Sequence, residues 1–408
     1  MTDSRRLADH TTFRVGGPAD RLIRAETEAE LIAAVRQADR DHTPLLVLAG
    51  GSNVLVGDDG FPGTVVLVAH RGRSATRPPA ETTSDRAMSD RAMSDQATPD
   101  SSRSLGATRL AVAVAPSPDT PVSAHALGAT PARAPGVTSA PPDDTTTVLV
   151  TAAAGEVWDE LVAWTVDQGW SGLEALSGVP GLVGAAPVQN IGAYGAEIAT
   201  VVARVRVFDR RTNQVRVLSP ADCGFGYRVS DFKRQPDRHV ILSLDLRLRP
   251  GGASAPIQHA ELARRLGVEP GATAPPAAVR RAVLELRRSK GMVLDPDDHD
   301  TWSAGSFFTN PLLPADQAAA LPGETPRYLQ PDGRVKLSAA WLIEQAGFLR
   351  GYGDGPAGLS SRHVLALTNR GQARAADILA LARTIRARVE DRFGVTLTPE
   401  PVLVNCQL

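Results

Sequence analysis

The chain has 408 residues, which is long enough for two or three domains with ordinary hydrophobic cores. Its 44 Lys and Arg residues nearly balance its 45 Asp and Glu residues, so the formal net charge is −1 and we expect no nucleic acid or membrane partner. The cysteines are Cys223 and Cys406, which excludes a zinc ribbon, an iron–sulfur site and a disulfide scaffold, and we predict no metal site. The N-terminus is polar and no membrane-length apolar run follows it, which predicts a cytoplasmic protein.

Residues 1–70 form the first predicted unit, a small α/β arrangement. It is expected to contain one helix, whose apolar side chains share one face, and three strands. The predicted helix covers residues 27–40, and the predicted strands cover residues 20–24, 45–49 and 65–68.

Composition changes abruptly between residues 71 and 146. This stretch is rich in Pro, Ser, Thr, Ala and Asp, and residues 84–93 repeat the sequence Ser-Asp-Arg-Ala-Met. Such a segment cannot bury enough apolar surface to offset the entropy of ordering, so a disordered low-complexity insertion is predicted. A regulatory or partner-binding tail is one interpretation. The repeat favours the other, an expansion by replication slippage in a tolerant loop.

From residue 147 onward, helices and strands alternate without one long parallel sheet, which indicates several small α+β units. Strands are predicted at residues 147–151, 201–208, 214–218, 239–248 and 363–368. Helices are predicted at residues 155–168, 261–266, 276–290, 338–346 and 373–393, and an extended segment at 396–404.

Two glycine-rich segments follow predicted strands or helices. Gly50, Gly51, Ser52 and Asn53 come directly after the strand at 45–49, where successive N–H groups could bind an anion, although a hairpin turn explains them as well. The second segment, 177–195, is built almost entirely of small residues. A large planar ligand could lie against its backbone, with amide hydrogen bonds to a heterocycle. Together the two segments suggest a dinucleotide clamped between two units, and the residues assigned to it in the second segment are Gly178, Gly184, Gln189, Asn190 and Gly192.

A serine without a general base lies in the segment 305–311. Ser306 stands between a glycine and two phenylalanines, and neither a Gly-x-Ser-x-Gly elbow nor a recognisable His-Asp pair accompanies it. The pattern suggests a positioned proton donor beside a ligand. The segment taken alone favours the other interpretation, a tight turn in which Phe307 and Phe308 fill a core.

Two charged residues complete the set of candidates. Arg228 lies in an aromatic context, Phe-Gly-Tyr-Arg, that would orient its guanidinium group. Glu400 precedes a proline, which disfavours a helix and holds the carboxylate in extended backbone. Each would be read as a surface residue if it stood alone.

Six ordered motifs resemble the UDP-N-acetylenolpyruvoylglucosamine reductase family of peptidoglycan precursor enzymes, the type with a tyrosine-containing extra substrate loop. The motifs are Thr12–Gly17, Gly50–Asn53, Ile191–Gly195, Gly226–Arg228, Gly305–Pro311 and Glu400–Pro401. The resemblance implies an α+β chain with a two-subdomain FAD-binding fold of the vanillyl-alcohol-oxidase/PCMH type plus a C-terminal α/β substrate-binding domain. In this chain the two subdomains would cover residues 1–70 and 147–300, the substrate domain 301–395, and the tail carrying the catalytic Glu 396–408.

The resemblance also implies a reaction and its residues. Non-covalent FAD, reduced by NADPH, would pass a hydride from N5 to the methylene carbon of UDP-N-acetyl-3-O-(1-carboxyvinyl)glucosamine. Ser306 would protonate the adjacent carbon to give UDP-N-acetylmuramate, the cell-wall precursor. Charge builds on the substrate carboxyl group, where Arg228 and Glu400 could stabilise the enolate, the latter with a shared proton. A monomer acting on a UDP-sugar is expected.

Further residues match family positions that contact the sugar nucleotide. They are Lys290, Asn310, Lys336 and Gln345, together with Tyr194 in the extra loop. His259 stands where the family has a second tyrosine, and it could stack or bind a phosphate there.

Two other functions are open at the level of sequence. A flavin oxidase of the same fold would often tether FAD through His or Cys, and no such residue accompanies the first glycine turn. A non-catalytic nucleotide-sugar sensor is the other, against which the presence of Ser306, Arg228 and Glu400 argues.

Overall fold

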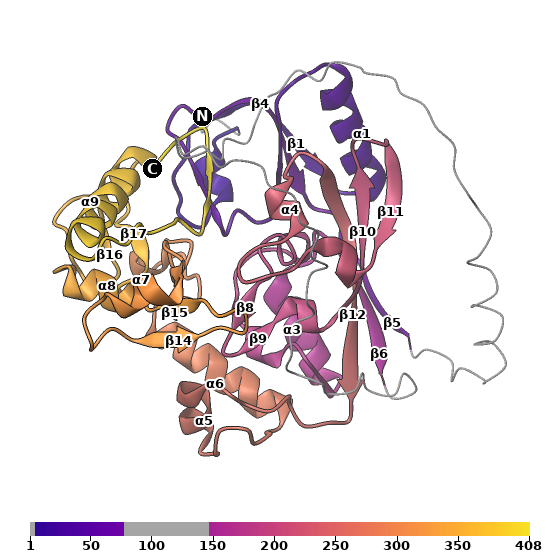
Figure 1. Cartoon of the computed structure of the whole chain (residues 1–408). Helices are drawn as coiled ribbons and strands as arrows, with labels where there is room; N and C mark the ends of the chain where they lie inside the picture. The colour runs from indigo at the N-terminus through magenta and orange to yellow at the C-terminus, as the bar shows by residue number, and fades with distance from the viewer. Residues whose placement is uncertain (1–4, 77–146) are drawn as a thin grey trace, which may run out of the picture.

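The first predicted subdomain is a three-stranded parallel sheet covered by one helix (Figure 1). The computed structural model describes residues 5–76 and 147–408. The strand order is β1 (Ala19–Ala25), β4 (Phe61–Val68), β2 (Leu45–Leu48), and α1 (Glu28–Arg40) packs on the sheet. Thr27 caps α1 by accepting a hydrogen bond from the Glu30 N–H, while the Glu30 side chain accepts from the Thr27 N–H, so the local sequence fixes the start of the helix. The predicted helix and strands of this unit are confirmed.

The second subdomain contains a six-stranded antiparallel sheet. Its order is β11 (Gln214–Leu218), β10 (Val202–Asp209), β12 (His239–Pro250), β6 (Val148–Ala153), β5 (Arg73–Thr76), with β7 (Trp170–Ser171) paired to β12. Helix α3 (Trp158–Asp167) buries Trp158, Leu161 and Val162 in the same core as the sheet. Burial of these large apolar side chains is the main stabilising contribution to this unit.

Strand β5 corrects the predicted start of the insertion. Residues 71–76 are included in the predicted disordered stretch, whereas Arg73–Thr76 pair with Leu149–Ala152 in the sheet. All four β5 side chains are exposed, so backbone hydrogen bonds pair the strand with its neighbour. Its sequence therefore lacks the alternation of apolar and polar residues from which a strand can be predicted. The rest of the predicted insertion, 77–146, lies outside the described residues.

Two helices form a small separate core beside the second subdomain. They are α5 (Ala260–Leu266) and α6 (Pro276–Ser289), which bury Leu262, Val279 and Val283 between them. Helix α6 also packs against the 3-10 helix Glu174–Leu176. The pair therefore lies at the edge of the glycine-rich segment.

The C-terminal domain combines helices with two small sheets. Helices α7 (Ala315–Ala319), α8 (Ala339–Gln345) and α9 (Ala375–Phe393) accompany the sheets β13 (Leu312–Leu313), β15 (Val335–Leu337), β14 (Arg327–Leu329) and β16 (Ala357–Leu359), β17 (Leu367–Asn369). The strand predicted at 363–368 is wrong in its bounds, because residues 360–366 form a turn held by polar contacts and the strand begins at Leu367.

The remaining described elements are short. The strands are β8 (Gly192–Ala193) and β9 (Ala196–Glu197), and the helices are α4 (Asp231–Arg234) and the 3-10 helices Leu7–His10, Val183–Ala185, Ile198–Thr200, Pro220–Cys223 and His299–Thr301. No helix in the described ranges is long and apolar enough to cross a membrane.

Segments from both ends of the chain join the first subdomain to the C-terminal domain. Phe13 and Leu55 belong to the same buried cluster as Phe307 and Phe308. Strand β18 (Val402–Val404) pairs in parallel with β3 (Val54–Val56), which ties the C-terminal segment to the first subdomain. These contacts close the molecule around a central cleft.

Candidate active site

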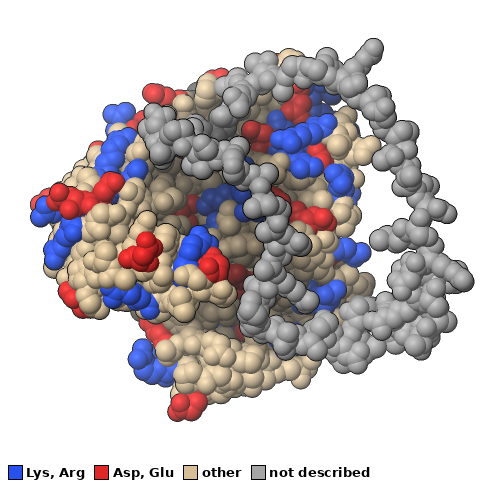
Figure 2. All heavy atoms as spheres, viewed as in Figure 1, with Lys and Arg blue, Asp and Glu red and all other residues tan. Residues whose placement is uncertain are grey.

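A cleft of about 480 Å³ lies where the two subdomains and the C-terminal domain meet. Figure 2 shows one face of the molecule hollowed beside the C-terminal domain, with Lys and Arg side chains inside the hollow. The volume is in the range of cofactor and ligand sites. Twelve of the residues predicted from sequence line it: Gly51, Ser52, Asn53, Gly184, Gln189, Gly192, Tyr194, Arg228, His259, Lys290, Ser306 and Glu400.

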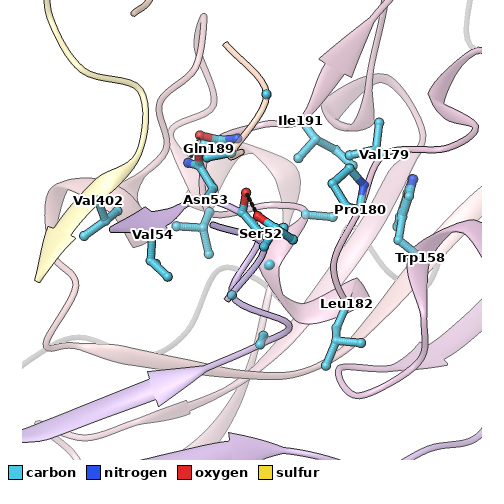
Figure 3. A pocket seen from close by; sticks show the side chains of 18 of the residues that line it. Ser52, Asn53, Val54, Trp158, Val179, Pro180, Leu182, Gln189, Ile191 and Val402 are labelled. Carbon is cyan, nitrogen blue, oxygen red and sulfur yellow. Dashed lines mark hydrogen bonds between the residues drawn. The ribbon is translucent and has the colours of Figure 1, made fainter. Parts of the chain in front are cut away.

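The two glycine-rich segments touch each other at this cleft. A Cβ on Gly50 would lie 2.9 Å from the Gly181 Cα, and Gly50 has a φ of 79°, so the approach requires glycine. The Asn53 Nδ2 group donates a hydrogen bond to Gln189 Oε1 across the two subdomains. Figure 3 shows Ser52, Asn53 and Gln189 on one side of the cleft and the apolar side chains of Trp158, Val179, Pro180, Leu182 and Ile191 on the other. An apolar wall facing a few polar groups suits a flat heterocycle.

Arg228 and Glu400 form an ion pair inside the cleft. The Arg228 Nε lies 3.3 Å from Glu400 Oε1, and the Arg228 Nη2 donates a 2.7 Å hydrogen bond to the Gly192 carbonyl. Arg228 occupies the left-handed region with a φ of 55°, in the turn closed by Gly226 and Val229. The guanidinium group is therefore oriented by its neighbours, as the sequence predicts.

Glu400 is largely withdrawn from solvent. Its side chain is 15% exposed, and burial raises its pKa above the ordinary value, although Arg228 and Lys233 lower it. Loss of hydration disfavours the charged carboxylate more than the two cations favour it. Glu400 is thus a carboxyl group that holds a proton more readily than an exposed glutamate.

Ser306 is brought next to Glu400 by backbone hydrogen bonds. The Glu400 N–H donates to the Phe307 carbonyl at 2.8 Å, and the Phe307 N–H donates to the Leu365 carbonyl at 2.7 Å. Phe307 and Phe308 are fully buried in the C-terminal core, while Ser306 lines the cleft. The phenylalanines thus anchor the segment in the core and Ser306 faces the cleft, where its role as a proton donor stays a prediction.

Family models match both halves of the chain. The C-terminal domain of UDP-N-acetylenolpyruvoylglucosamine reductase matches residues 295–404, and an FAD binding domain matches residues 19–75 and 142–218. The reductase of Cutibacterium acnes is 46% identical over 405 residues, covering 98% of this chain and 90% of that protein. The reductase of Thermobifida fusca is 47% identical, covering 98% and 97%. The chain belongs to the UDP-N-acetylenolpyruvoylglucosamine reductase family.

A solved structure of the same family confirms the fold class. The reductase of Thermus caldophilus has a TM-score of 0.55 and 25% sequence identity, covering 98% of this chain and 97% of that one. The match to the FAD binding domain falls in two separate segments of the chain, residues 19–75 and 142–218. The protein is therefore an FAD-binding oxidoreductase of the reductase family with the family's own C-terminal domain.

An aromatic and basic cluster lies in the same cleft of this reductase-family chain. The Tyr194 and His259 rings meet edge to face at 5.1 Å, and the Lys290 ammonium lies 5.8 Å from the centre of the Tyr194 ring. Lys290 also pairs with Glu261 at 2.5 Å. Burial raises the pKa of Tyr194 to about 12 and lowers the pKa of His259. Uncharged rings beside a lysine are suited to a nucleotide with its phosphates.

Six predicted site residues do not line the cleft. Lys336 lies 5.2 Å over the Tyr227 ring, and the Asn310 Oδ1 accepts a hydrogen bond from the Ala339 N–H. Gln345 is exposed at the end of α8, where its carbonyl accepts from Arg392 of α9. The Asn190 side chain is buried and donates to the Gly226 carbonyl and Glu197, so it supports the Arg228 turn. Gly50 and Gly178 lie behind the surface of the cleft, where Gly178 makes room for Leu284 and Arg287.

Sequence reasoning missed two titratable residues of this site. Arg287, one turn before Lys290 on α6, and His363 both line the cleft. Burial, followed by Lys290 and Arg350, lowers the pKa of His363 to about 4, so its imidazole is neutral. Helical spacing from Lys290 could have indicated Arg287, whereas no local pattern marks His363.

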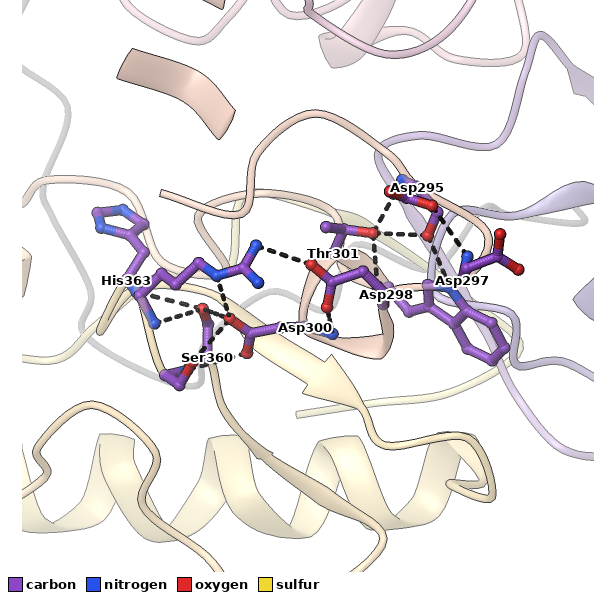
Figure 4. A network of polar contacts seen from close by, with 10 residues as sticks. Asp295, Asp297, Asp298, Asp300, Thr301, Ser360 and His363 are labelled. Carbon is purple, nitrogen blue, oxygen red and sulfur yellow. Dashed lines mark hydrogen bonds and ion pairs between the residues drawn. The ribbon is translucent and has the colours of Figure 1, made fainter. Parts of the chain in front are cut away.

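A polar network fixes the segment that leads to Ser306 (Figure 4). Asp300 accepts from the Ser360 hydroxyl at 2.9 Å and from the Ser361 N–H at 2.9 Å, and Arg362 pairs with Asp298 at 2.7 Å. The network joins the loop before Ser306 to the turn that carries His363. Both residues are thereby held at the wall of the cleft.

Proposed function

We propose that the protein reduces UDP-N-acetyl-3-O-(1-carboxyvinyl)glucosamine to UDP-N-acetylmuramate, using NADPH as the electron donor. The observation that carries the proposal is the meeting of Arg228, Ser306 and Glu400 in one cleft formed by three parts of the chain. The relatives bear the name of this reductase, and the chain has the FAD-binding and C-terminal domains of the family.

The cofactor would be held between the subdomains. Ser52, Asn53 and Gln189 supply polar contacts, and Leu182, Ile191 and Trp158 supply an apolar wall. When bound, FAD supplies the hydride that it has accepted from NADPH. The glycines at 50 and 51 allow the turn after β2 to approach the second subdomain closely enough to enclose the dinucleotide.

The protein residues would act on the substrate's three-carbon group. Addition of a hydride to the methylene carbon places negative charge on the adjacent carbon and its carboxyl group. Arg228 would neutralise that charge as it develops, and Glu400, whose pKa is raised, would share a proton with the same oxygens. The Ser306 hydroxyl would donate its proton to the carbon, since a strongly basic carbanion can deprotonate a serine placed beside it.

The nucleotide end of the substrate would lie against the Tyr194–His259–Lys290 cluster. Lysine suits a diphosphate, and the two rings offer faces to the uridine. Lys336, Asn310 and Gln345 do not line the cleft in this structure, and Lys336 lies over the ring of Tyr227, the neighbour of Arg228. We further propose that the enzyme acts as a cytoplasmic monomer, which light scattering of the purified holoenzyme would check.

The test separates the two half-reactions. Ser306→Ala should leave reduction of the flavin by NADPH intact and slow its reoxidation by the enolpyruvyl substrate by about 10³-fold, because only the second half-reaction needs the proton. Stopped-flow absorbance of the flavin measures both. Equal loss in the two half-reactions would contradict the role of Ser306, and a wild-type enzyme that is not reoxidised by this substrate would overturn the proposed reaction.

A further inference from the structure

A half-buried lysine beside Glu400, Lys233, has no role in the reaction described above. Lys233 lies on α4, and its Nζ donates a 3.2 Å hydrogen bond to the main-chain carbonyl of Glu400. The Asn53 Nδ2 donates to the same carbonyl at 3.3 Å. Side chains from both FAD subdomains therefore hold the backbone of one residue in the C-terminal tail.

The position of Lys233 is fixed by the start of its helix. Ser230 is fully buried and caps α4, accepting from the Lys233 N–H at 3.3 Å and donating to the Val188 carbonyl at 2.5 Å. The neighbouring Phe232 is 4% exposed. Because α4 is anchored on both sides, the ammonium group is directed to Glu400 rather than to solvent, which is unusual for lysine.

The lysine also acts on the charge of the site. Burial lowers the pKa of Lys233, while Glu400 raises it. In the described part of the chain, the charged or titratable groups facing the Glu400 carboxyl are Arg228, Lys233 and Tyr227. Arg228 and Lys233 are the two cations that lower the pKa of Glu400 against the effect of burial.

We propose that Lys233 is a positioning residue, which fixes the main chain of Glu400 and limits how firmly its carboxyl group holds a proton. This role rests on the proposed function for its effect on turnover. Lys233 acts through Glu400 and not on the substrate. Because Lys233 holds the main chain of Glu400, the Glu400 carboxyl group is kept in one arrangement relative to Arg228.

Replacing the charge tests the proposal. In Lys233→Met, reoxidation of the reduced flavin by the enolpyruvyl substrate should be roughly tenfold slower at its pH plateau, because Glu400 is less well placed. The fall in rate toward high pH, where Glu400 loses its proton, should move to higher pH, because a cation that favours the carboxylate is gone. In Lys233→Arg, the fall in reoxidation rate should return to the pH at which it occurs in the wild type, because arginine keeps the positive charge.

Two controls separate this role from general support of the fold. Glu400→Gln and the double variant Glu400→Gln/Lys233→Met should show the same pH dependence as each other. Arg234→Met, an exposed neighbour on α4, should behave as wild type. The proposal would be overturned if Lys233→Met did not change the pH at which the reoxidation rate falls. It would also be overturned if Lys233→Met caused the same change in the Glu400→Gln background.

A readout without turnover keeps the test independent of the reaction. The carboxyl ¹³C resonance of Glu400, assigned by its absence in Glu400→Gln, should titrate at higher pH in Lys233→Met than in wild type. An unchanged titration would overturn the role of Lys233 even if the enzyme performs the proposed reaction. A shifted titration in an enzyme that does not reoxidise with this substrate would overturn the proposed function and leave the electrostatic role standing.

Discussion

Two charge pairs of the site lie in different surroundings. Arg228 meets Glu400, whose side chain is 15% exposed, and this pair is tied to Gly192 and Lys233. Lys290 meets Glu261, and about a third of each of these side chains is exposed. Because the Arg228–Glu400 pair is largely buried, its geometry is fixed and Arg228 lowers the pKa of Glu400. The second pair is accessible, so Glu261 can act as a counter-ion that an incoming phosphate displaces.

The largest expected effect comes from breaking the buried pair. Arg228→Met should slow flavin reoxidation by about 10²- to 10³-fold, because the developing negative charge loses its positioned cation. Stopped-flow absorbance with the enolpyruvyl substrate measures the loss. The pKa of Glu400 should rise further in this variant, since Arg228 is the main group that lowers it. Reduction by NADPH serves as the internal control, and a matching loss there would mean that Arg228 supports the fold instead.

Breaking the Lys290–Glu261 pair should change substrate binding more than the chemical step. Lys290→Ala should raise the KM for the UDP-sugar about tenfold, the equivalent of ~1.4 kcal/mol, with little change in kcat, because a phosphate contact is equally useful before and during the reaction.

A substitution of Glu261, the partner of Lys290, should change the KM in the opposite direction. Glu261→Gln removes the competing carboxylate, so the KM should fall slightly. A KM that rises in Glu261→Gln would show that the glutamate holds Lys290 in place and is not a counter-ion that a phosphate displaces.

The smallest effect is expected at His259, the residue predicted from sequence to stand in place of a tyrosine. His259→Phe keeps the edge-to-face contact with Tyr194 and removes the ring nitrogens, one of which is buried without a hydrogen-bond partner. The KM should change roughly threefold, the value of one modest hydrogen bond. Because burial lowers the pKa of His259, the ring is neutral near pH 7, and the KM of the wild type should be flat there. A KM that rises steeply around the ordinary histidine pKa would contradict this.

The residues found from sequence have strong local constraints. Ser306 lies between a glycine and buried phenylalanines, Arg228 in a glycine-aromatic turn, and Glu400 before a proline, so each stands in a short recognisable pattern. The cleft brings these three together. Their chemical roles stay predictions until the half-reactions are measured.

The missed features depend on distant partners. Lys233 acquires its place through a carbonyl at residue 400, and His363 through Asp300 and Ser360. Strand β3 is three residues long and pairs with β18 from the other end of the sequence. Such contacts leave no periodicity or spacing for a local pattern to detect. The glycine turn was found, but the structure shows that Gly50 makes room for Gly181 as well as shaping the turn.

The pairing of β18 with β3 bears on the order in which a newly made chain becomes competent. The first subdomain emerges early during synthesis and can fold as a unit, because domains generally fold as they are made. Arg228, however, meets Glu400 only after nearly all of this sequence has been translated. A partly made chain could therefore enclose its flavin while lacking the carboxyl group that the proposed reaction needs. The protein would remain inactive until the segment that carries Glu400 has been synthesised and has paired with β3.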